Sequence, residues 1–325
     1  MPVPPSVAPG SPALAAAAGL TARSKFTEAE AAANKLSDGD KYSLGGNVLR
    51  ARLAMSANQL QQAQALLAQA RRLDPHDAEA TALLGEVLAL EERWMDAAPM
   101  YERGKKNGLA LQAQELAAAM PYQPFRIEGL GALNRIRLIH TNPAAVVAVR
   151  VNGGDVINFA VDLNAGQTVV DGALAKQMGL KTIADIDELL ADTFKPSDAK
   201  VERVTYSTIG ALAMGVWVVH DLPVMERNLM SNASGAQGLI GTGVLRHFLV
   251  TLDLPHGELW LQRVDDASAA AARKQAQASA VKTVPVRFTA TGALVHADGS
   301  PIEDALLREG PVTMDFQAMV LWIGK

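Results

Sequence analysis

One acidic residue stands where an apolar segment ends in a turn of small residues. In the stretch NFAVDLNAGQTVVDGALAKQMGL, residues 158–180, Asp162 follows a strand-like run and Leu163, Asn164 and Ala165 begin the turn after it. A carboxylate in this position has two interpretations. It caps the end of a strand, or it is one of two acids that share a proton and together activate a water molecule.

The segment that carries Asp162 belongs to a region rich in β-branched residues. From residue 122 to 264 apolar and polar residues alternate, and Asn-Gly-Gly at 152–154 supplies the turn of a hairpin. We expect strands over most of this region and short helices at DGALAKQMG and ADIDELLAD. The strand that ends at Asp162 is therefore expected to lie in a mainly-β domain.

Two stretches of this region resemble the retropepsin-like aspartyl protease family. They are FAVDLNAGQTVVDGALAKQMGL and GLIGTGVLRHFLVTLDLPHGELWL, in which Gly-Leu-Ile-Gly at 238–241 matches the buried apolar-glycine motif of the family. The resemblance covers about residues 146–261 and implies a retropepsin-like (acid protease) fold for a domain at 122–264. It also implies that Asp162 is the catalytic aspartate.

The resemblance implies roles for further residues. Leu163, Asn164 and Ala165 form the active-site turn, in which leucine replaces the family's Thr or Ser and asparagine replaces its Gly. One such domain supplies one aspartate, so the second is expected from a homodimer through the β domain. A flap over a bound peptide is expected within YSTIGALAMG, and an ordinary pair of core strands is the alternative for this segment. The flap candidates are Ser207, Thr208, Ile209 and Gly210.

The region from residue 26 to 120 has apolar residues at helical spacing and small residues that recur at a fixed interval. Ala63 and Ala97 are 34 positions apart, and so are Leu67 and Tyr101. The pattern, above all ALLGEVLALEERWMDAAPMYERGKKNG, resembles the tetratricopeptide repeat. This resemblance implies helical hairpins with a concave face for a peptide or a partner protein. A generic helical bundle without a binding role is the alternative.

The remaining segments carry weaker patterns. Residues 1–25 are rich in Pro, Ala and Gly and are expected to be a disordered leader. Residues 265–282 are expected to be a linker, with an exposed helix as the alternative. Residues 283–325 have no clear fold, with a final hairpin as the alternative for the stretch KTVPVRFTATGALVHADGSPI. The chain is thus predicted to be a multidomain α plus β protein, with TPR-like helical hairpins followed by a mainly-β domain.

Composition excludes several classes of function. The formal charge of −4 and the aromatic content of 5% in a chain of 325 residues make a nucleic-acid partner unexpected. The absence of cysteine excludes thiolate chemistry, and six scattered histidines give no metal-ligand spacing, so neither a metal nor a cofactor is expected. No apolar run is long enough to span a membrane. The family resemblance suggests a periplasmic or secreted protein, whereas the first residues show no clear signal peptide.

Two functions from different classes follow from these patterns. The first is an aspartic-type endopeptidase, in which Asp162 and its copy in a homodimer activate water for attack on a peptide bond. The second is a peptide- or protein-binding protein that kept the β domain and lost the Thr-Gly half of its motif. The choice depends on Leu163 and Asn164, because a misplaced pair of acids loses much of its rate.

Overall fold

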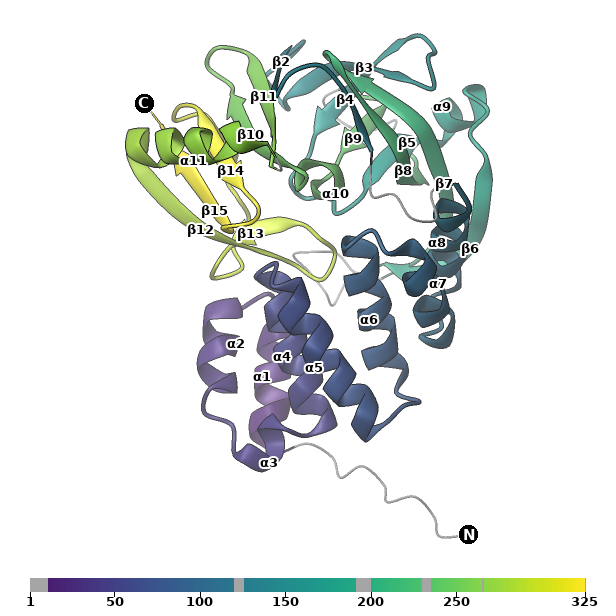
Figure 1. Ribbon diagram of the computed structural model, residues 1–325, viewed down its shortest axis with the longest axis vertical. Coiled ribbons are helices and arrows are strands. Elements are labelled where there is room, and N and C mark those ends of the chain that lie inside the picture. The colour runs from purple at the N-terminus through teal and green to yellow at the C-terminus, as the bar shows by residue number, and fades with distance from the viewer. Residues whose placement is uncertain (1–10, 120–125, 191–199, 230–234, 265, 325) are drawn as a thin grey trace.

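The computed structural model describes residues 11–119, 126–190, 200–229, 235–264 and 266–324. Helices make up the N-terminal part of the molecule, and two β-sheets make up most of the rest (Figure 1). A helical region followed by a mainly-β region confirms the predicted α plus β organisation. No helix among these residues is long and apolar enough to cross a membrane.

Helical hairpins form the N-terminal part. The helices are α1 (Pro12–Ala22), α2 (Phe26–Ala33), α3 (Asp38–Lys41), α4 (Leu44–Ser56), α5 (Leu60–Leu73), α6 (Ala78–Leu90), α7 (Trp94–Arg103) and α8 (Asn107–Ala119). Small residues allow neighbouring helices to touch, because a Cβ on Gly104 would lie 2.6 Å from the Cβ of Ala82. Asp77 begins α6 by accepting the N–H of Ala80 at 2.6 Å. Helices α2 to α8 lie within the region from residue 26 to 120, where helical hairpins were predicted.

The segment expected to be a disordered leader is helical where the structure describes it. The hydroxyl of Ser11 accepts the N–H of Leu14 and so caps α1. Leu14 and Ala17 are buried in an apolar cluster with Phe26. The prediction is wrong here because an alanine-rich segment is a good helix former once its apolar face packs against other helices. Residues 1–10 lie outside the described residues.

The first sheet contains the strand that ends at Asp162. Its strands are β1 (Ile127–Gly129), β3 (Val146–Val151), β4 (Val156–Val161), β5 (Thr168–Asp171), β6 (Thr182–Leu190), β7 (Lys200–Met214), β8 (Trp217–Arg227) and β9 (Gly238–Ile240). Their order across the sheet is β1-β8-β5-β9-β4-β3-β7-β6. β9 runs parallel to β4 and lies between β4 and β5. The loop from β4 to β5 therefore passes over the end of β9. Short helices α9 (Gly172–Gln177) and α10 (Thr242–Leu245) follow β5 and β9.

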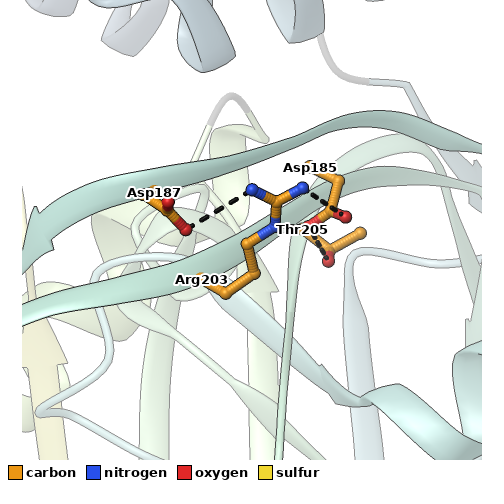
Figure 2. A network of polar contacts seen from close by, with 4 residues as sticks. All are labelled: Asp185, Asp187, Arg203 and Thr205. Atoms are coloured by element: carbon orange, nitrogen blue, oxygen red, sulfur yellow. Dashed lines mark hydrogen bonds and ion pairs between the residues drawn. The ribbon is translucent and has the colours of Figure 1, made fainter.

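The segment ADIDELLAD was expected to be a helix and instead continues β6 as far as residue 190. Figure 2 shows how charged side chains join β6 to β7 on an exposed face. Arg203 Nε donates to Asp185 Oδ1 at 2.7 Å, Arg203 Nη1 lies 3.4 Å from Asp187 Oδ1, and the Thr205 hydroxyl donates to Asp185 at 3.2 Å. The bond from Arg203 lowers the pKa of Asp185. The helix prediction is wrong because pairing with β7 outweighs the helix propensity of Glu, Leu and Ala.

The second sheet joins the end of the predicted β domain to the C-terminal residues. Its strands are β2 (Leu133–Arg137), β10 (Phe248–Asp253), β11 (Glu258–Arg263), β12 (Lys282–Phe288), β13 (Leu294–His296), β14 (Val312–Asp315) and β15 (Val320–Ile323). Their order is β13-β12-β15-β14-β10-β11-β2, and the short helix α12 (Asp304–Leu307) precedes β14. The segment without an expected fold thus completes this sheet, and the β region continues beyond residue 264.

The segment at 265–282, expected to be a linker, contains α11 (Ala267–Ser279), as the exposed-helix alternative had it. Ala269 is buried, and Arg273 Nε donates to Asp315 Oδ2 in β14 at 2.8 Å. The helix is therefore attached to the second sheet.

A single apolar core contains residues of both sheets, with Trp217 stacked on Phe248 at 5.6 Å between ring centroids. The helical part is joined to both sheets. From α8, the Gln112 amide donates to the carbonyl oxygens of Ser207 at 3.0 Å and Val224 at 3.1 Å. Asn58 donates to the carbonyl oxygen of Phe316 at 2.8 Å. These contacts join the helices to the first sheet at β7 and β8 and to the second sheet just after β14.

Candidate functional site

Asp162 lies directly after β4, at the start of the turn that leads to β5. Its backbone N–H donates to the carbonyl oxygen of Ile240 in β9 at 3.1 Å, and its Oδ1 accepts the N–H of Asn164 at 2.9 Å. The residue is half-buried and borders a cavity. One carboxylate oxygen thus helps to shape the turn at the cavity wall.

The turn at 162–167 folds around a glycine that follows β9. A Cβ on Gly241 would lie 2.6 Å from the carbonyl oxygen of Ala165, so no larger residue fits there. The next residue, Thr242, donates its N–H to the same carbonyl oxygen at 2.8 Å. The apolar-glycine motif therefore holds the turn that carries Asp162.

Two of the positions at which the turn departs from the expected family pattern, 163 and 164, have different surroundings. Leu163 is 7% exposed and belongs to the core between the sheets, and its carbonyl oxygen accepts the N–H of Leu294 at 2.7 Å. Asn164 is exposed and borders the cavity with Asp162. At position 163, apolar packing of leucine thus takes the place of the hydrogen bonds that a Thr or Ser hydroxyl would form.

A second turn of the same chain, residues 289–293 between β12 and β13, faces the turn of Asp162. A Cβ on Gly166 would lie 1.9 Å from the carbonyl oxygen of Thr291 and 3.0 Å from Cα of Gly292. The Thr242 hydroxyl donates to the carbonyl oxygen of Gly292 at 2.6 Å. The chain's own backbone thus fills the place opposite the Asp162 turn.

Two adjoining cavities lie between the helical part and these turns. The smaller has a volume of about 620 Å³ and is bordered by Asp162, Asn164 and Ala290. The larger, of about 1210 Å³, extends from the 289–293 turn along α1, α4 and α6. We call the two together the cleft. The charged and polar side chains that border both cavities include Glu86, Tyr101, Lys106 and Arg246.

Burial changes the pKa values of charged groups that border the cleft. It raises the pKa of Glu86. It lowers the pKa of Arg246 to about 10, against the opposing charge of Glu92, so the guanidinium is still a cation at neutral pH. The Arg246 guanidinium donates to the Asn58 side chain and lies 5.6 Å from the Phe288 ring centroid. A cation is thus held in the cleft beside the 289–293 turn.

His247, the neighbour of Arg246, is uncharged. Its Nδ1 lies 3.2 Å from Glu92 Oε1, and a carboxylate at that distance favours the protonated ring. Burial and the charge of Arg246 act in the opposite direction and lower the pKa of His247 to about 3. The lowering prevails, because the side chain is mostly covered, at 22% exposed, and has a cation as its neighbour. The contact with Glu92 is then a hydrogen bond of a neutral imidazole.

The four flap candidates lie in the middle of β7. Ser207, Thr208 and Ile209 pair with β8, and Ser207 and Ile209 are fully buried. Gly210 follows them in the same strand. The turn of this hairpin is at Gly215 instead, which has a φ of 58°. The alternative of an ordinary core strand pair describes this placement better than a flap does.

Two other acids, in or near turns, accept hydrogen bonds that stabilise those turns. Asp253 is 5% exposed and accepts the N–H of His256 at 3.1 Å. Asp298 accepts the hydroxyl and N–H of Ser300, which lowers its pKa. Neither residue borders the two cavities. Among the described residues, no group of three or more His, Asp or Glu side chains could hold a metal ion.

No family model matches the sequence, and no curated protein matches it. A solved structure that is similar to this chain is a retropepsin-like aspartic protease from Rickettsia conorii, with a TM-score of 0.30 and 16% sequence identity. The match covers 44% of this chain and 97% of that one. A likeness at this level shows nothing about the activity of this chain.

The sequence patterns did not indicate the 289–293 turn or Arg246 as parts of the site. The only local signal of the turn is the run Thr291-Gly292-Ala293, which many hairpins share. Arg246 lies in the matched stretch GLIGTGVLRHFLVTLDLPHGELWL, but a single arginine next to a short helix is ordinarily a surface residue.

Proposed function

We propose that the protein binds an extended segment of another protein in the cleft, and that it does so without a pair of catalytic aspartates. The contact between Gly166 and Gly292 carries this proposal, because the 289–293 turn, which contains no acid, already packs against the turn of Asp162. A copy of Asp162 from another molecule would have to displace that turn. Binding a peptide requires no such rearrangement.

The lining of the cleft supports a peptide ligand. Its cavities, of about 620 and 1210 Å³, together exceed the roughly 300–1,000 Å³ of a typical small-molecule pocket. Leu90 and Leu109 supply apolar surface in both, and Arg246 supplies a half-buried cation. A guanidinium suits a carboxylate because its N–H groups match the two oxygens. We expect a bound segment with apolar residues and one Asp, Glu or C-terminal carboxylate.

The helical hairpins supply the second wall of the cleft. Glu86 and Leu90 of α6 and Tyr101 of α7 border both cavities. A tetratricopeptide-like module would hold an extended peptide on such a face, so the predicted repeat and the predicted peptide ligand support each other. In this proposal both the helices and the β region contact the ligand.

An aspartic-type endopeptidase with a retropepsin-like domain is the second candidate. It is favoured by the position of Asp162, a half-buried carboxylate that borders the cleft and forms no ion pair among the described residues. Such catalysis needs a second carboxyl group that shares a proton with the first. The described acids that border the same cavity are Glu86 and Glu92. Burial raises the pKa of Glu86, and the charges that act on it are those of Arg52 and Lys106 rather than that of Asp162.

Peptide binding is tested with fluorescein-labelled peptides from denatured casein, followed by fluorescence anisotropy. We expect Arg246→Gln to weaken binding at least about 10-fold, because a bond to a charged group is lost. Arg308→Gln is the matched control, since Arg308 borders neither cavity and its contact is Asn142. Equal affinities of the wild type and both variants would contradict the proposed binding site.

Hydrolysis is tested on intact denatured casein at about pH 3 to 7, with and without pepstatin. The binding proposal expects no pepstatin-sensitive cleavage by the wild type or by Asp162→Asn. Cleavage that pepstatin blocks and Asp162→Asn abolishes would establish the endopeptidase instead.

A further inference from the structure

Two stretches of the β region repeat each other without gaps. Residues 240–261 read IGTGVLRHFLVTLDLPHGELWL, and residues 302–323 read IEDALLREGPVTMDFQAMVLWI. Eight of the 22 aligned positions are identical, and four more exchange one apolar residue for another. The spacing is 62 positions throughout, as from Thr251 to Thr313 and from Trp260 to Trp322. The sequence therefore contains an internal repeat of 22 residues.

The secondary structure follows the same spacing. α10 (Thr242–Leu245) and α12 (Asp304–Leu307) start and end at equivalent positions. β10 and β14 end at the equivalent residues Asp253 and Asp315, and β11 and β15 start at the equivalent residues Glu258 and Val320. Each stretch is thus a short helix followed by a hairpin.

The hairpin turns agree in detail. Asp253 accepts the N–H of His256, and Asp315 accepts the N–H of Ala318, which is the equivalent bond. The residue that follows has positive φ in both turns, 70° at Gly257 and 52° at Met319. A methionine rarely adopts this backbone conformation, so the equivalence is not explained by residue type.

The two copies pair with each other around a local two-fold axis. In the β10–β14 ladder Thr251 pairs with Thr313, its own equivalent, and their Oγ1 atoms lie 2.9 Å apart. Val250 pairs with Met314 and Leu252 with Val312, so the register is the same when the strands are exchanged. The pairing thus places the axis between the two threonines.

The neighbouring strands obey the same symmetry. β11 pairs with β2, and β15 pairs with β12, with Leu259 opposite Ile136 and the equivalent Leu321 opposite Val284. The order β12-β15-β14-β10-β11-β2 is therefore the same from either end when β12 is equivalent to β2, β15 to β11 and β14 to β10. Figure 1 shows β10 and β11 beside β14 and β15 in the same part of the molecule.

We propose that residues 282–323 are a second, shortened copy of the unit formed by β2, α10, β10 and β11, and that this copy takes the place of a second molecule at the two-fold axis. The site of Asp162 is then built from two unequal halves of one chain. The half that contains the first copy also carries the turn with the carboxylate, and the second copy carries the 289–293 turn, which contains no acid. This holds whether the cleft binds peptides or cleaves them.

The arrangement replaces the expected homodimer. A molecule that lacked the second copy would expose the backbone of β10 as an open sheet edge, and such an edge pairs readily with another chain. Here β14 covers that edge within the same molecule. The site should therefore be complete in a single chain.

Crosslinking tests the pairing, because the chain has no cysteine of its own. In the full-length Thr251→Cys/Thr313→Cys variant we expect oxidation to consume both thiols and leave a protein of monomer mass on a non-reducing gel. The matched control is Thr251→Cys/Thr283→Cys. Its strands are separated by β14 and β15, about 14 Å in all, which is too far for a disulfide. Free thiols in the first variant, or an equal crosslink in the control, would overturn the proposal.

A mixing experiment decides whether the two copies meet within one chain or between two. Equal amounts of the single variants Thr251→Cys and Thr313→Cys are unfolded together, refolded and oxidised. We expect monomers only, since each molecule pairs its own β10 with its own β14. Disulfide-linked dimers that contain one chain of each variant would show exchange between molecules and would refute the single-chain arrangement. Melting curves of the reduced single variants establish that each one folds.

Discussion

Gly166 and Gly292 meet backbone to backbone between the two turns that border the cleft. A Cβ on Gly292 would lie 2.7 Å from Cα of Gly166. The two glycines are needed for different reasons, since Gly292 has a φ of 79° whereas Gly166 does not have positive φ. Space alone requires glycine at 166, and both space and backbone conformation require it at 292.

Substitution of Gly166 should therefore destabilise the whole β region. In Gly166→Ala the added methyl group would lie 1.9 Å from the carbonyl oxygen of Thr291, which cannot rotate away. We expect a loss of at least about 2 kcal/mol in the free energy of unfolding, measured by urea titration. Gly172→Ala is the control, because no heavy atom lies within 4 Å of its added methyl group. A similar stability of the two variants would show that the turns are not in contact.

His247 should make stability depend on pH. Its pKa is about 3 in the folded protein and about 6.5 in an unfolded chain. Between these values the unfolded chain binds a proton that the folded protein does not. The free energy of unfolding therefore falls as pH is lowered from about 6.5, by at most about 1.4 kcal/mol per pH unit from this one group.

Urea midpoints of the wild type and His247→Gln at about pH 7 to 4 test this dependence. The wild type should lose more stability than the variant over this range. His76→Gln, a change at an exposed loop histidine, should keep the wild-type slope. A His247→Gln slope equal to that of the wild type would mean that the half-buried ring is protonated in the folded state as well.

The features that could be predicted from the sequence are those that depend on neighbouring residues. The strand before Asp162 and the glycine turn at 152–154 follow from local patterns, and both are present. The helical start at Pro12–Ala22 and the strand at Thr182–Leu190 were missed, because contacts with distant segments decide both. Local propensity cannot weigh such contacts.

The site could be predicted only in part, for a similar reason. Asp162 and Gly241 belong to recognisable stretches, whereas Gly292 acquires its role from a contact across more than a hundred residues. The internal repeat was present in the sequence, with Thr251 and Trp260 matched at Thr313 and Trp322. Its structural consequence, the pairing of the two copies, depends on the strand register, which cannot be predicted from the repeat alone.

Removal of Arg273 should leave the buried carboxylate of Asp315 without its ion-pair partner. Asp315 is 2% exposed and accepts Arg273 Nε at 2.8 Å, besides the N–H groups of Gln317 and Ala318. Arg273→Ala leaves this charge with backbone donors only, so we expect a loss of about 2 kcal/mol in the free energy of unfolding. Lys274→Ala, the exposed neighbour in α11, should change it by less than about 0.5 kcal/mol. Equal values would mean that the backbone bonds satisfy Asp315 and that α11 is not held by the ion pair.

The attachment of the helical part to the first sheet depends on Gln112. This side chain is 3% exposed and donates to the carbonyl oxygens of Ser207 and Val224. In Gln112→Ala two buried carbonyl oxygens lose their side-chain donor, so we expect a loss of about 2 kcal/mol in the free energy of unfolding. Gln114→Ala, at an exposed position of the same helix, controls for the change in helix propensity. If α8 also sets the width of the cleft, Gln112→Ala should weaken the binding of casein peptides while Gln114→Ala leaves it unchanged. Unaltered binding together with lowered stability would show that the cleft keeps its shape without this contact.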